Sequence, residues 1–264
     1  MAQPISQQLS LEIDGAAAVV ARSRHVVALT GAGMSVESGI PPFRGPGGLW
    51  TKYGEPPMNG YQRFLADPAG AWRERLSLSG PMRKLWQTLE AAQPNPGHHA
   101  LARLEAAGIL RCVITQNVDN LHRLAGNQLL AEIHGNFTLI RCIECSRRFE
   151  SAVIALDVLP PRCPDCHGIL KSDTVSFGEP IPADVLAHCF DESERCDCML
   201  VAGTSATVYP AAQFPIDVAQ RGGAVIEINP YETELSPLAT ISLRGPSAVV
   251  LPELVERVCG LRRT

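Results

Sequence analysis

The chain has 264 residues, of which 45% are hydrophobic and 19% are charged. This length favours one large α/β domain with a small inserted module, and the composition can bury a sizeable core. The 23 basic and 27 acidic residues give a net charge of −4, which argues against a protein held to nucleic acid mainly by its own charge. We therefore expect no direct nucleic-acid partner.

No run of the sequence reaches the roughly 20 apolar residues that a membrane-spanning helix needs. The N-terminal stretch MAQPISQQLS lacks the basic and apolar regions of a signal peptide. We therefore expect a cytoplasmic protein with no membrane partner. Nine cysteines, an odd number, favour metal binding over disulfide bonds in that compartment.

Apolar periodicity, with Gly and Pro as breakers, predicts the elements of the chain. In the first half they are a helix over 9–23, a buried strand over 25–30, a loop over 41–60, helical spacing over 61–92, a helix over 98–107 and a strand over 112–115. In the second half they are a cysteine-rich module over 142–171, a strand and loop over 173–178, a strand over 198–202, a helix over 211–220, a strand over 224–228 and a helix over 252–259 with Pro252 in its first turn. Strands separated by helices predict a doubly wound, Rossmann-like parallel sheet, in which ligands bind beyond the carboxyl ends of the strands.

Four cysteines form two pairs, Cys142-x-x-Cys145 and Cys163-x-x-Cys166. Each pair can chelate from a tight knuckle, and two knuckles supply four thiolates for a tetrahedral zinc ion. Because four thiolates leave no open coordination position, we expect one structural Zn²⁺ rather than a catalytic one. The alternative is a set of four buried structural cysteines.

A glycine turn, Gly31-Ala32-Gly33, follows the first predicted strand. Glycines let backbone N–H groups approach a pyrophosphate, so the turn is a candidate dinucleotide site. The pattern lacks the third glycine of the usual fingerprint and an acidic residue ending a strand about 20 residues further on, so a plain strand-to-helix turn is the alternative. Asn229, which ends a later strand, is a candidate for the ribose hydroxyls instead.

One more polar group follows a predicted strand, and a histidine stands alone further along the chain. Gln116, Asn117 and Asp119 can orient a carboxamide and a sugar, or form an Asx turn or helix cap. The imidazole of His134, which precedes Gly135, can take a proton from a hydroxyl at physiological pH, although a lone histidine is more often structural.

Taken together, these segments resemble the sirtuin family of NAD-dependent protein lysine deacylases, in its bacterial type. The resemblance is carried, in the order of the family, by 31–44 (GAGMSVESGIPPFR), 115–119 (TQNVD), His134-Gly135, the four cysteines, 176–179 (SFGE), 203–205 (GTS) and 226–229 (IEIN). It covers nearly the whole chain. We expect a single domain over 1–264, with a Rossmann-like part at about 9–44, 98–135 and 173–264, a helical module at about 45–97 and a zinc module at about 136–172.

The resemblance also implies where ligands bind. The NAD contacts would be Gly31, Ala32, Gly33, Ser35, Ile40, Phe43, Arg44, Gln116, Asn117, Asp119, Gly203, Thr204, Ser205, Asn229 and Ala248. The segment 175–179 would pair with an acyl-lysine peptide as an added strand, through Val175, Phe177, Gly178 and Glu179.

The implied reaction removes an acyl group from a protein lysine and releases nicotinamide and O-acyl-ADP-ribose. The acyl carbonyl oxygen would attack the ribose carbon that carries nicotinamide, and His134 would act as the base on a ribose hydroxyl. His134 and Asn117 would be the catalytic residues. Nicotinamide is a cationic leaving group, so this cleavage needs positioning and charge stabilisation more than a protein nucleophile.

The sequence departs from the family pattern at two places. Pro42 stands where the family often has Asp. The segments 45–50 and 203–210 resemble the branch that includes desuccinylases, in which a Tyr and an Arg three residues later bind an acidic acyl group. Alignment places Arg75 and Leu78 at those positions, so we predict acetyl or other neutral acyl groups over succinyl.

Three other functions fit parts of this pattern less well. A mono-ADP-ribosyltransferase or an NAD hydrolase could use the same pocket, but His134 favours deacylation because a transferase need not activate a ribose hydroxyl. A zinc dehydrogenase needs an open zinc position, which four cysteines do not leave. A zinc-ribbon nucleic-acid module is disfavoured by the net charge of −4. We expect a monomer that acts on acyl-lysine proteins or peptides.

Overall fold

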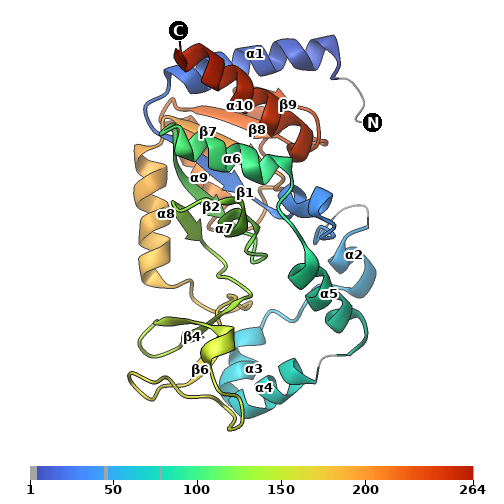
Figure 1. Cartoon of the computed structure of the whole chain (residues 1–264), viewed down its shortest axis with the longest axis vertical. Coiled ribbons are helices and arrows are strands. Elements are labelled where there is room, and N and C mark those ends of the chain that lie inside the picture. The colour runs from blue at the N-terminus through green and yellow to red at the C-terminus, as the bar shows by residue number, and fades with distance from the viewer. Residues whose placement is uncertain (1–4, 45–46, 78, 264) are drawn as a thin grey trace.

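The computed structural model describes residues 5–44, 47–77 and 79–263 (Figure 1). Its elements in chain order are α1 (Gln7–Arg22), β1 (Val26–Thr30), η1 (Ala32–Ser38), α2 (Leu49–Tyr53), α3 (Gly60–Ala66), α4 (Pro68–Leu76), α5 (Gly80–Ala91), α6 (Pro96–Ala106), β2 (Leu110–Thr115), α7 (Leu121–Ala125), β3 (Leu130–Glu132), β4 (Leu139–Cys142), β5 (Arg148–Glu150), η2 (Ser151–Val153), β6 (Leu170–Ser172), α8 (Ala183–Arg195), β7 (Cys198–Ala202), α9 (Gln213–Gln220), β8 (Ala224–Ile228), η3 (Ser236–Leu238), β9 (Ile241–Leu243) and α10 (Ser247–Arg263).

Six strands form one sheet in the order β3-β2-β1-β7-β8-β9, and all neighbours are parallel. The chain builds outward from β1 through β2 to β3, and then from β7 through β8 to β9 on the other side. The switch in direction therefore lies between β1 and β7, where doubly wound sheets bind ligands. The predicted doubly wound parallel sheet is confirmed.

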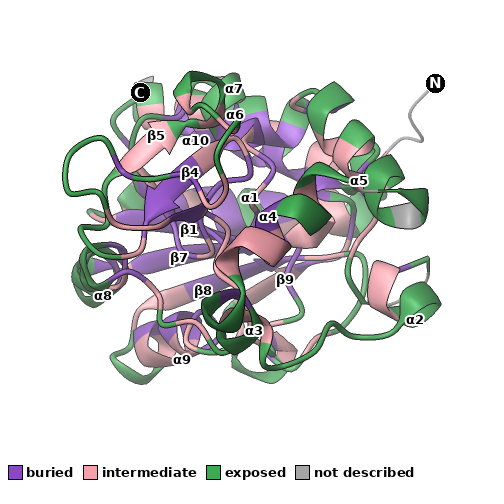
Figure 2. Cartoon of the chain, turned by 90° about the horizontal axis from the view of Figure 1, so that it is seen from below, coloured by how far each residue is buried: buried purple, intermediate pink, exposed green. Residues whose placement is uncertain are grey.

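Helices cover both faces of this sheet, which explains why every residue of β1 and β7 is buried. Alternate residues point to opposite faces: Val26 and Ala28 pack with α1, α6 and α10, whereas Val27 and Leu29 pack with α8 and α9. The resulting core is the buried centre of the view in Figure 2. Within the described residues, no helix is both long and apolar enough to cross a membrane.

A second, smaller sheet is antiparallel and has the order β5-β4-β6. It packs with the helices α3 and α4 around Phe64, Trp72, Ile140 and Leu170. The indole Nε1 of Trp72 donates a hydrogen bond of 2.8 Å to the carbonyl of Leu170, which ties α4 to β6. These elements lie at the end of the molecule opposite α1 and α10 (Figure 1).

The predicted strands over 198–202 and 224–228 are confirmed at both ends. The helical spacing over 61–92 is divided among α3, α4 and α5. One break falls at Asp67, whose side chain caps α4 by accepting the N–H of Gly70 at 2.8 Å. The next lies between Leu76 and Gly80, the first residue of α5, which has a left-handed φ of 57°.

Two predicted elements are wrong. The strand expected from Asp173 does not form, because β6 ends at Ser172 and the chain then turns. Pro252 lies inside α10 rather than in its first turn. This helix starts earlier because the carbonyl of Pro246 accepts the N–H groups of Val249 and Val250, each at 3.0 Å.

Two buried imidazoles lie next to each other between α6 and α7. His98 and His122 are 0% and 3% exposed, and their ring centroids are 4.8 Å apart. Desolvation by burial lowers the pKa of His98 from 6.5 to about 2 and that of His122 from 6.5 to about 4. Both rings are therefore neutral in the folded protein at neutral pH.

This pair makes the free energy of unfolding depend on pH. The folded pKa values lie below the unfolded value of 6.5, so the stabilisation is present above pH 6.5 and is lost as the pH falls. Each histidine contributes a slope that approaches about 1.4 kcal/mol per pH unit between its folded pKa and pH 6.5. In urea unfolding between pH 6.5 and 4.5, His122→Gln should flatten the dependence, and the exposed His99→Gln should not. Equal slopes in all three proteins would contradict this account.

Candidate functional site

The carboxyl ends of β1, β2 and β7 place three polar turns together. Thr30 and Thr115 are the last residues of β1 and β2, and they are partners in the sheet register. The N–H of Gln116 donates to the carbonyl of Thr30 at 3.0 Å, and the N–H of Gly31 donates to the carbonyl of Ala202 at 3.1 Å. The residues that follow these three strands therefore start from one edge of the sheet.

The turns after β1 and β7 lie in direct backbone contact. The N–H of Gly33 donates to the carbonyl of Gly203 at 2.7 Å. A Cβ on Gly31 would lie 2.7 Å from Cβ of Thr204, and one on Gly33 would lie 2.8 Å from Cα of Gly203. Gly203 itself has φ of 63°, and its Cβ would lie 2.2 Å from the nitrogen of Met34. Glycine is therefore required at all three positions.

Asn117, Ser35 and Asp119 form one buried hydrogen-bonded group. Nδ2 of Asn117 donates to the carbonyl of Gly31 at 3.0 Å and to Oγ of Ser35 at 3.1 Å. Oγ of Ser35 donates to Oδ2 of Asp119 at 2.6 Å, and Oδ1 of Asp119 accepts the N–H of Leu121 at 3.0 Å. Desolvation raises the pKa of Asp119, and the hydrogen bond from Ser35 opposes that rise. This group fixes the amide of Asn117 beside the glycine turn.

A second set of hydrogen bonds connects the ends of β2, β7 and β8, through Gln116, Thr204 and Asn229. Nε2 of Gln116 donates to Oγ1 of Thr204 at 3.0 Å, and Nδ2 of Asn229 donates to the carbonyl of Thr204 at 3.1 Å. Ser205, the next residue, is exposed and shares a hydrogen bond of 2.9 Å with Thr207. Residues from β2, β7 and β8 thus meet above the switch point.

The imidazole of His134 belongs to the same cluster. His134 follows β3, and its Nδ1 lies 3.1 Å from the carbonyl oxygen of Gln116. Because a carbonyl only accepts, Nδ1 carries the proton and Nε2 keeps its lone pair. Desolvation by burial lowers the pKa of His134 below 6.5, and the hydrogen bond to Gln116 opposes that fall. The ring is therefore a neutral acceptor at neutral pH.

The other predicted NAD contacts lie around this cluster. Ala32 begins η1, and Ile40 packs with Ala92 and Leu121. Ala248 is half-buried in the first turn of α10, which packs on η1. Phe43 is 39% exposed and lies outside the buried group.

The loop after η1 makes an aromatic contact with the segment 175–179. The ring of Trp50 lies 5.1 Å from Phe43 and 5.8 Å from Phe177, measured between centroids. The guanidinium of Arg44 lies 4.4 Å from the Trp50 ring and 3.3 Å from Glu55. Phe43 and Phe177 are therefore linked through a tryptophan that the sequence analysis did not identify.

The segment 175–179 is held from both sides. The N–H of Val175 donates to the carbonyl of His134 at 2.9 Å, and the carbonyl of Phe177 accepts the N–H of Tyr61 at 3.1 Å. Nε2 of Gln62 donates to the carbonyl of Gly178 at 3.3 Å. The carboxylate of Glu179 is only 2% exposed and is engaged by Arg141 and Lys171, so its side chain is committed to the protein interior.

The four cysteines of the two knuckles gather at the small sheet. Their Sγ atoms all lie within 4.8 Å of one another, with Cys142 and Cys166 at 3.5 Å and Cys145 and Cys163 at 3.8 Å. Sulfurs on a tetrahedral zinc with bonds of about 2.3 Å lie about 3.8 Å apart, so the set fits zinc. The four thiolates hold one structural zinc ion.

The two knuckles share one backbone pattern. The N–H groups of Ser146 and His167 donate to the carbonyls of Cys142 and Cys163 at 3.1 and 2.9 Å. Both donors have left-handed φ, 61° for Ser146 and 62° for His167. These turns aim the two thiol pairs at one point.

The sequence analysis missed a relay that supports Asn117. Oγ1 of Thr30 donates to Oγ1 of Thr115 at 2.9 Å, and therefore accepts from Nε2 of His122 at 3.0 Å. Oγ1 of Thr115 in turn accepts the N–H of Asn117 at 3.1 Å. The available signal was a threonine at the last position of each of two adjacent strands, Thr30 and Thr115.

The doubly wound sheet, the contact between the glycine turns at its switch point and the four-cysteine module together define a class of protein. They are typical of an α/β protein that binds a dinucleotide. Residues 31–210 match the model of the Sir2 family. The chain is 46% identical over 241 residues to NAD-dependent protein deacylase 1 of Archaeoglobus fulgidus, covering 90% of this chain and 95% of that one. It is 45% identical over 249 residues to an NAD-dependent protein deacylase of Thermococcus kodakarensis, covering 92% and 94%. The chain belongs to the Sir2 family.

Solved structures agree with this assignment. A crystal structure of a Sir2 homologue in complex with NAD has a TM-score of 0.78 and 44% identity, with 94% of each chain covered. A Sir2 complex with a p53 peptide and NAD⁺ has a TM-score of 0.72 and 31% identity, covering 97% of this chain and 98% of that one. The likeness extends over nearly the whole of both chains.

Zinc removal tests the four-cysteine site. We expect the purified protein to hold about one zinc per chain, and Cys145→Ser to lose most of it, because three thiolates bind more weakly than four. The melting temperature should fall by several degrees, since metal binding stabilises the folded state. Elemental analysis and calorimetry measure both effects. Cys259→Ser, outside the cluster, is the control; an unchanged metal content in Cys145→Ser would reject the site.

Proposed function

We propose that this protein is an NAD-dependent protein lysine deacylase, which releases nicotinamide and O-acyl-ADP-ribose. The observation that carries this proposal is the tautomer of His134. Its Nδ1–H is held by the carbonyl of Gln116, so a neutral Nε2 is available as an acceptor next to Asn117 and the glycine turns. The named deacylases among its relatives support the same activity.

The donor set at the strand ends suits NAD. It combines amide side chains on Gln116, Asn117 and Asn229 with hydroxyls on Ser35 and Thr204. The carboxylate of Asp119 already accepts a hydrogen bond on each oxygen, so both oxygens are engaged within the protein. When bound, NAD supplies a glycosidic bond to a cationic nicotinamide leaving group. A relative is solved as an NAD complex, which supports NAD as the ligand.

The residues of this chain then have separate tasks. His134 accepts the proton of a ribose hydroxyl at Nε2, as a neutral imidazole of lowered pKa can do at pH 7. Asn117, fixed by Gly31 and Ser35, orients the nicotinamide end in a pocket that faces Ile40. Phe43 shields the reacting ribose carbon from water. Gly31, Gly33 and Gly203 keep the two turns in contact. In this proposal that contact keeps the side-chain amides of Gln116 and Asn117 in a fixed position relative to His134.

The peptide would lie along 175–179 and present its acyl-lysine toward His134. Val175 is joined to the backbone of His134, so a strand added here runs beside the base. A related Sir2 structure is solved with a p53 peptide and NAD⁺, which supports the binding of a peptide. In this proposal Val175, Phe177 and Gly178 contact the peptide directly, whereas Glu179 acts through Arg141 and Lys171. We also propose that the protein is a monomer and that it acts in the cytoplasm. This compartment is reducing, so the four cysteines remain available to zinc.

Replacing the base tests the activity directly. His134→Ala should lower the rate of acyl-ADP-ribose formation by roughly 10²- to 10⁴-fold, the usual contribution of a general base. The product is measured by mass spectrometry after incubation with NAD and an acetyl-lysine peptide. The exposed His99→Ala is the control and should retain full activity. Because burial lowers the pKa of His134, the acid limb of the wild-type profile should lie below pH 6.5. Full activity in His134→Ala would refute the assignment.

Acyl preference gives a second test. Arg75 places its guanidinium 4.1 Å from the Trp86 ring and 5.8 Å from the Trp72 ring, so its cation is already packed on aromatic faces. Leu78, the other aligned position, lies outside the described residues. We propose neutral acyl groups and expect acetyl-lysine peptides to turn over at least 10-fold faster than succinyl-lysine peptides of the same sequence, since burying a carboxylate without a free partner is costly. Faster desuccinylation would overturn this preference.

A further inference from the structure

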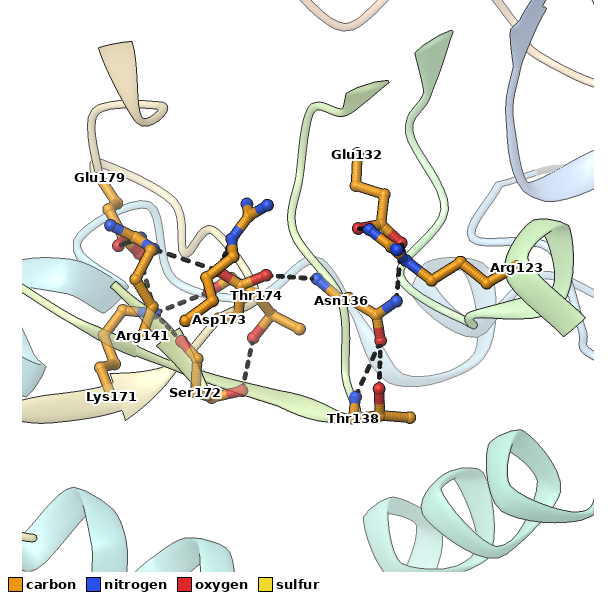
Figure 3. Close-up of polar contacts among 11 residues, drawn as sticks. Arg123, Glu132, Asn136, Thr138, Arg141, Lys171, Ser172, Asp173, Thr174 and Glu179 are labelled. Carbon is orange, nitrogen blue, oxygen red and sulfur yellow. Dashed lines mark hydrogen bonds and ion pairs between the residues drawn. The ribbon is translucent and has the colours of Figure 1, made fainter. Parts of the chain in front are cut away.

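A network of buried charged groups surrounds the turn that follows His134 (Figure 3). Its central residue is Asp173, which is 0% exposed. Oδ1 of Asp173 lies 2.9 Å from Nε of Arg148 and 3.2 Å from Nε of Arg141. Oδ2 accepts the backbone N–H of Asn136 at 2.9 Å. The carboxylate of Asp173 is therefore held by a charge-assisted hydrogen bond from Arg148 and by an ion-pair contact with Arg141.

Residues 173–175 hold the backbone on both sides of His134. Asp173 binds the N–H of Asn136, two residues after the base, and Val175 binds the carbonyl of His134 itself at 2.9 Å. Between them, Gly135 has a φ of 79°, and its Cβ would lie 2.1 Å from the carbonyl oxygen of Asp173. The turn therefore rests directly on the backbone of Asp173, and only glycine permits that contact.

The same network fixes Glu179, at the end of the segment 175–179 where we propose that the peptide binds. Arg141, which contacts Asp173, also donates to Glu179 at 2.5 Å, and Lys171 lies 3.0 Å from Glu179. The carboxylate of Glu179 accepts the N–H of Ser176 at 2.8 Å. Arg141 thus joins residue 173 to residue 179, so both ends of the segment and the turn after His134 share one set of contacts.

On the Rossmann side, Asn136 continues the network. Its Nδ2 donates to Oε1 of Glu132 at 2.7 Å, and Glu132 is paired with Arg123 by two hydrogen bonds of 2.9 and 2.7 Å. Figure 3 shows the two halves of the network meeting at the contact between Asn136 and Asp173. The turn that carries the base is therefore held between β3 and β6.

We propose that Asp173 is a positioning residue for His134, which sets the imidazole at a fixed place relative to the peptide segment. This inference rests on the proposed function. A misplacement of a catalytic group by about 1 Å can cost roughly 100-fold in rate, so a residue that fixes the turn affects the step in which the base acts. Asp173 itself touches neither ligand in this proposal and acts through Asn136 and Gly135.

The test is Asp173→Asn, which keeps an acceptor for Asn136 and removes the charge that holds Arg141 and Arg148. Two rates are measured on one preparation with NAD and an acetyl-lysine peptide: formation of acyl-ADP-ribose, and exchange of labelled nicotinamide into NAD. In the proposed mechanism His134 is needed only after nicotinamide has left. The variant should therefore lose roughly 10- to 100-fold in product formation with little loss of exchange. The ratio of the two rates is independent of the fraction of folded protein.

Asp197→Asn is the matched control. Oδ1 and Oδ2 of Asp197 accept the N–H groups of His25 and Arg24, both at 2.9 Å, at the opposite end of the sheet. This variant loses a comparable carboxylate and should leave the ratio unchanged. If Asp173→Asn fails to fold, Arg148→Met replaces it. This second variant removes one of the ion-pair partners of Asp173, and the side chain of Arg148 is 27% exposed, so the change is easier to accommodate.

The outcomes separate the two proposals. The positioning role is supported if the ratio of exchange to product formation rises at least 10-fold in Asp173→Asn, or in Arg148→Met where that variant replaces it, and not in Asp197→Asn. Equal losses in both rates, or no loss, overturn that role while the proposed function stands. Wild-type protein that forms no acyl-ADP-ribose overturns the proposed function itself.

Discussion

The contact between two backbone turns at the switch point is the constraint on which the site depends. Gly33 donates to Gly203 at 2.7 Å, and a side chain at 31, 33 or 203 would occupy space already held by the other turn. This approach brings the ends of β1 and β7 together, so Asn117 and Gln116 from β2 can each reach a neighbouring turn. The hydrogen bonds of Asn117 with Gly31 and of Gln116 with Thr204 depend on that close approach.

The small sheet contributes rigidity rather than reacting groups. Two knuckles place four Sγ atoms within 4.8 Å, and a closed set of four thiolates leaves no position for a substrate. From this sheet, Arg141 and Lys171 reach Glu179, and Asp173 reaches the turn after His134. Because most of the backbone of the segment 175–179 is already fixed, this segment loses little conformational freedom when the proposed peptide binds to it.

Several elements could be predicted from the sequence because their signal is local. The runs CMLVA and AVIEI are long enough for an apolar pattern, and both strands match the predicted bounds. The three-residue strands Leu130–Glu132 and Ile241–Leu243 are too short to show a period, and α8 (Ala183–Arg195) was not anticipated. The strand expected from Asp173 failed because this residue turns its carboxylate inward to ion pairs that lie far away in sequence.

The sequence by itself determined the sheet type, the four-cysteine set and the identity of the groups at the strand ends, because spacing and residue chemistry are local properties. Only the tertiary structure decided which nitrogen of His134 carries its proton, since the carbonyl of Gln116 that sets it comes from another strand. It also decided that Glu179 faces inward and that Thr30, Thr115 and His122 support Asn117. These are contacts between residues distant in sequence, and packing alone fixes them.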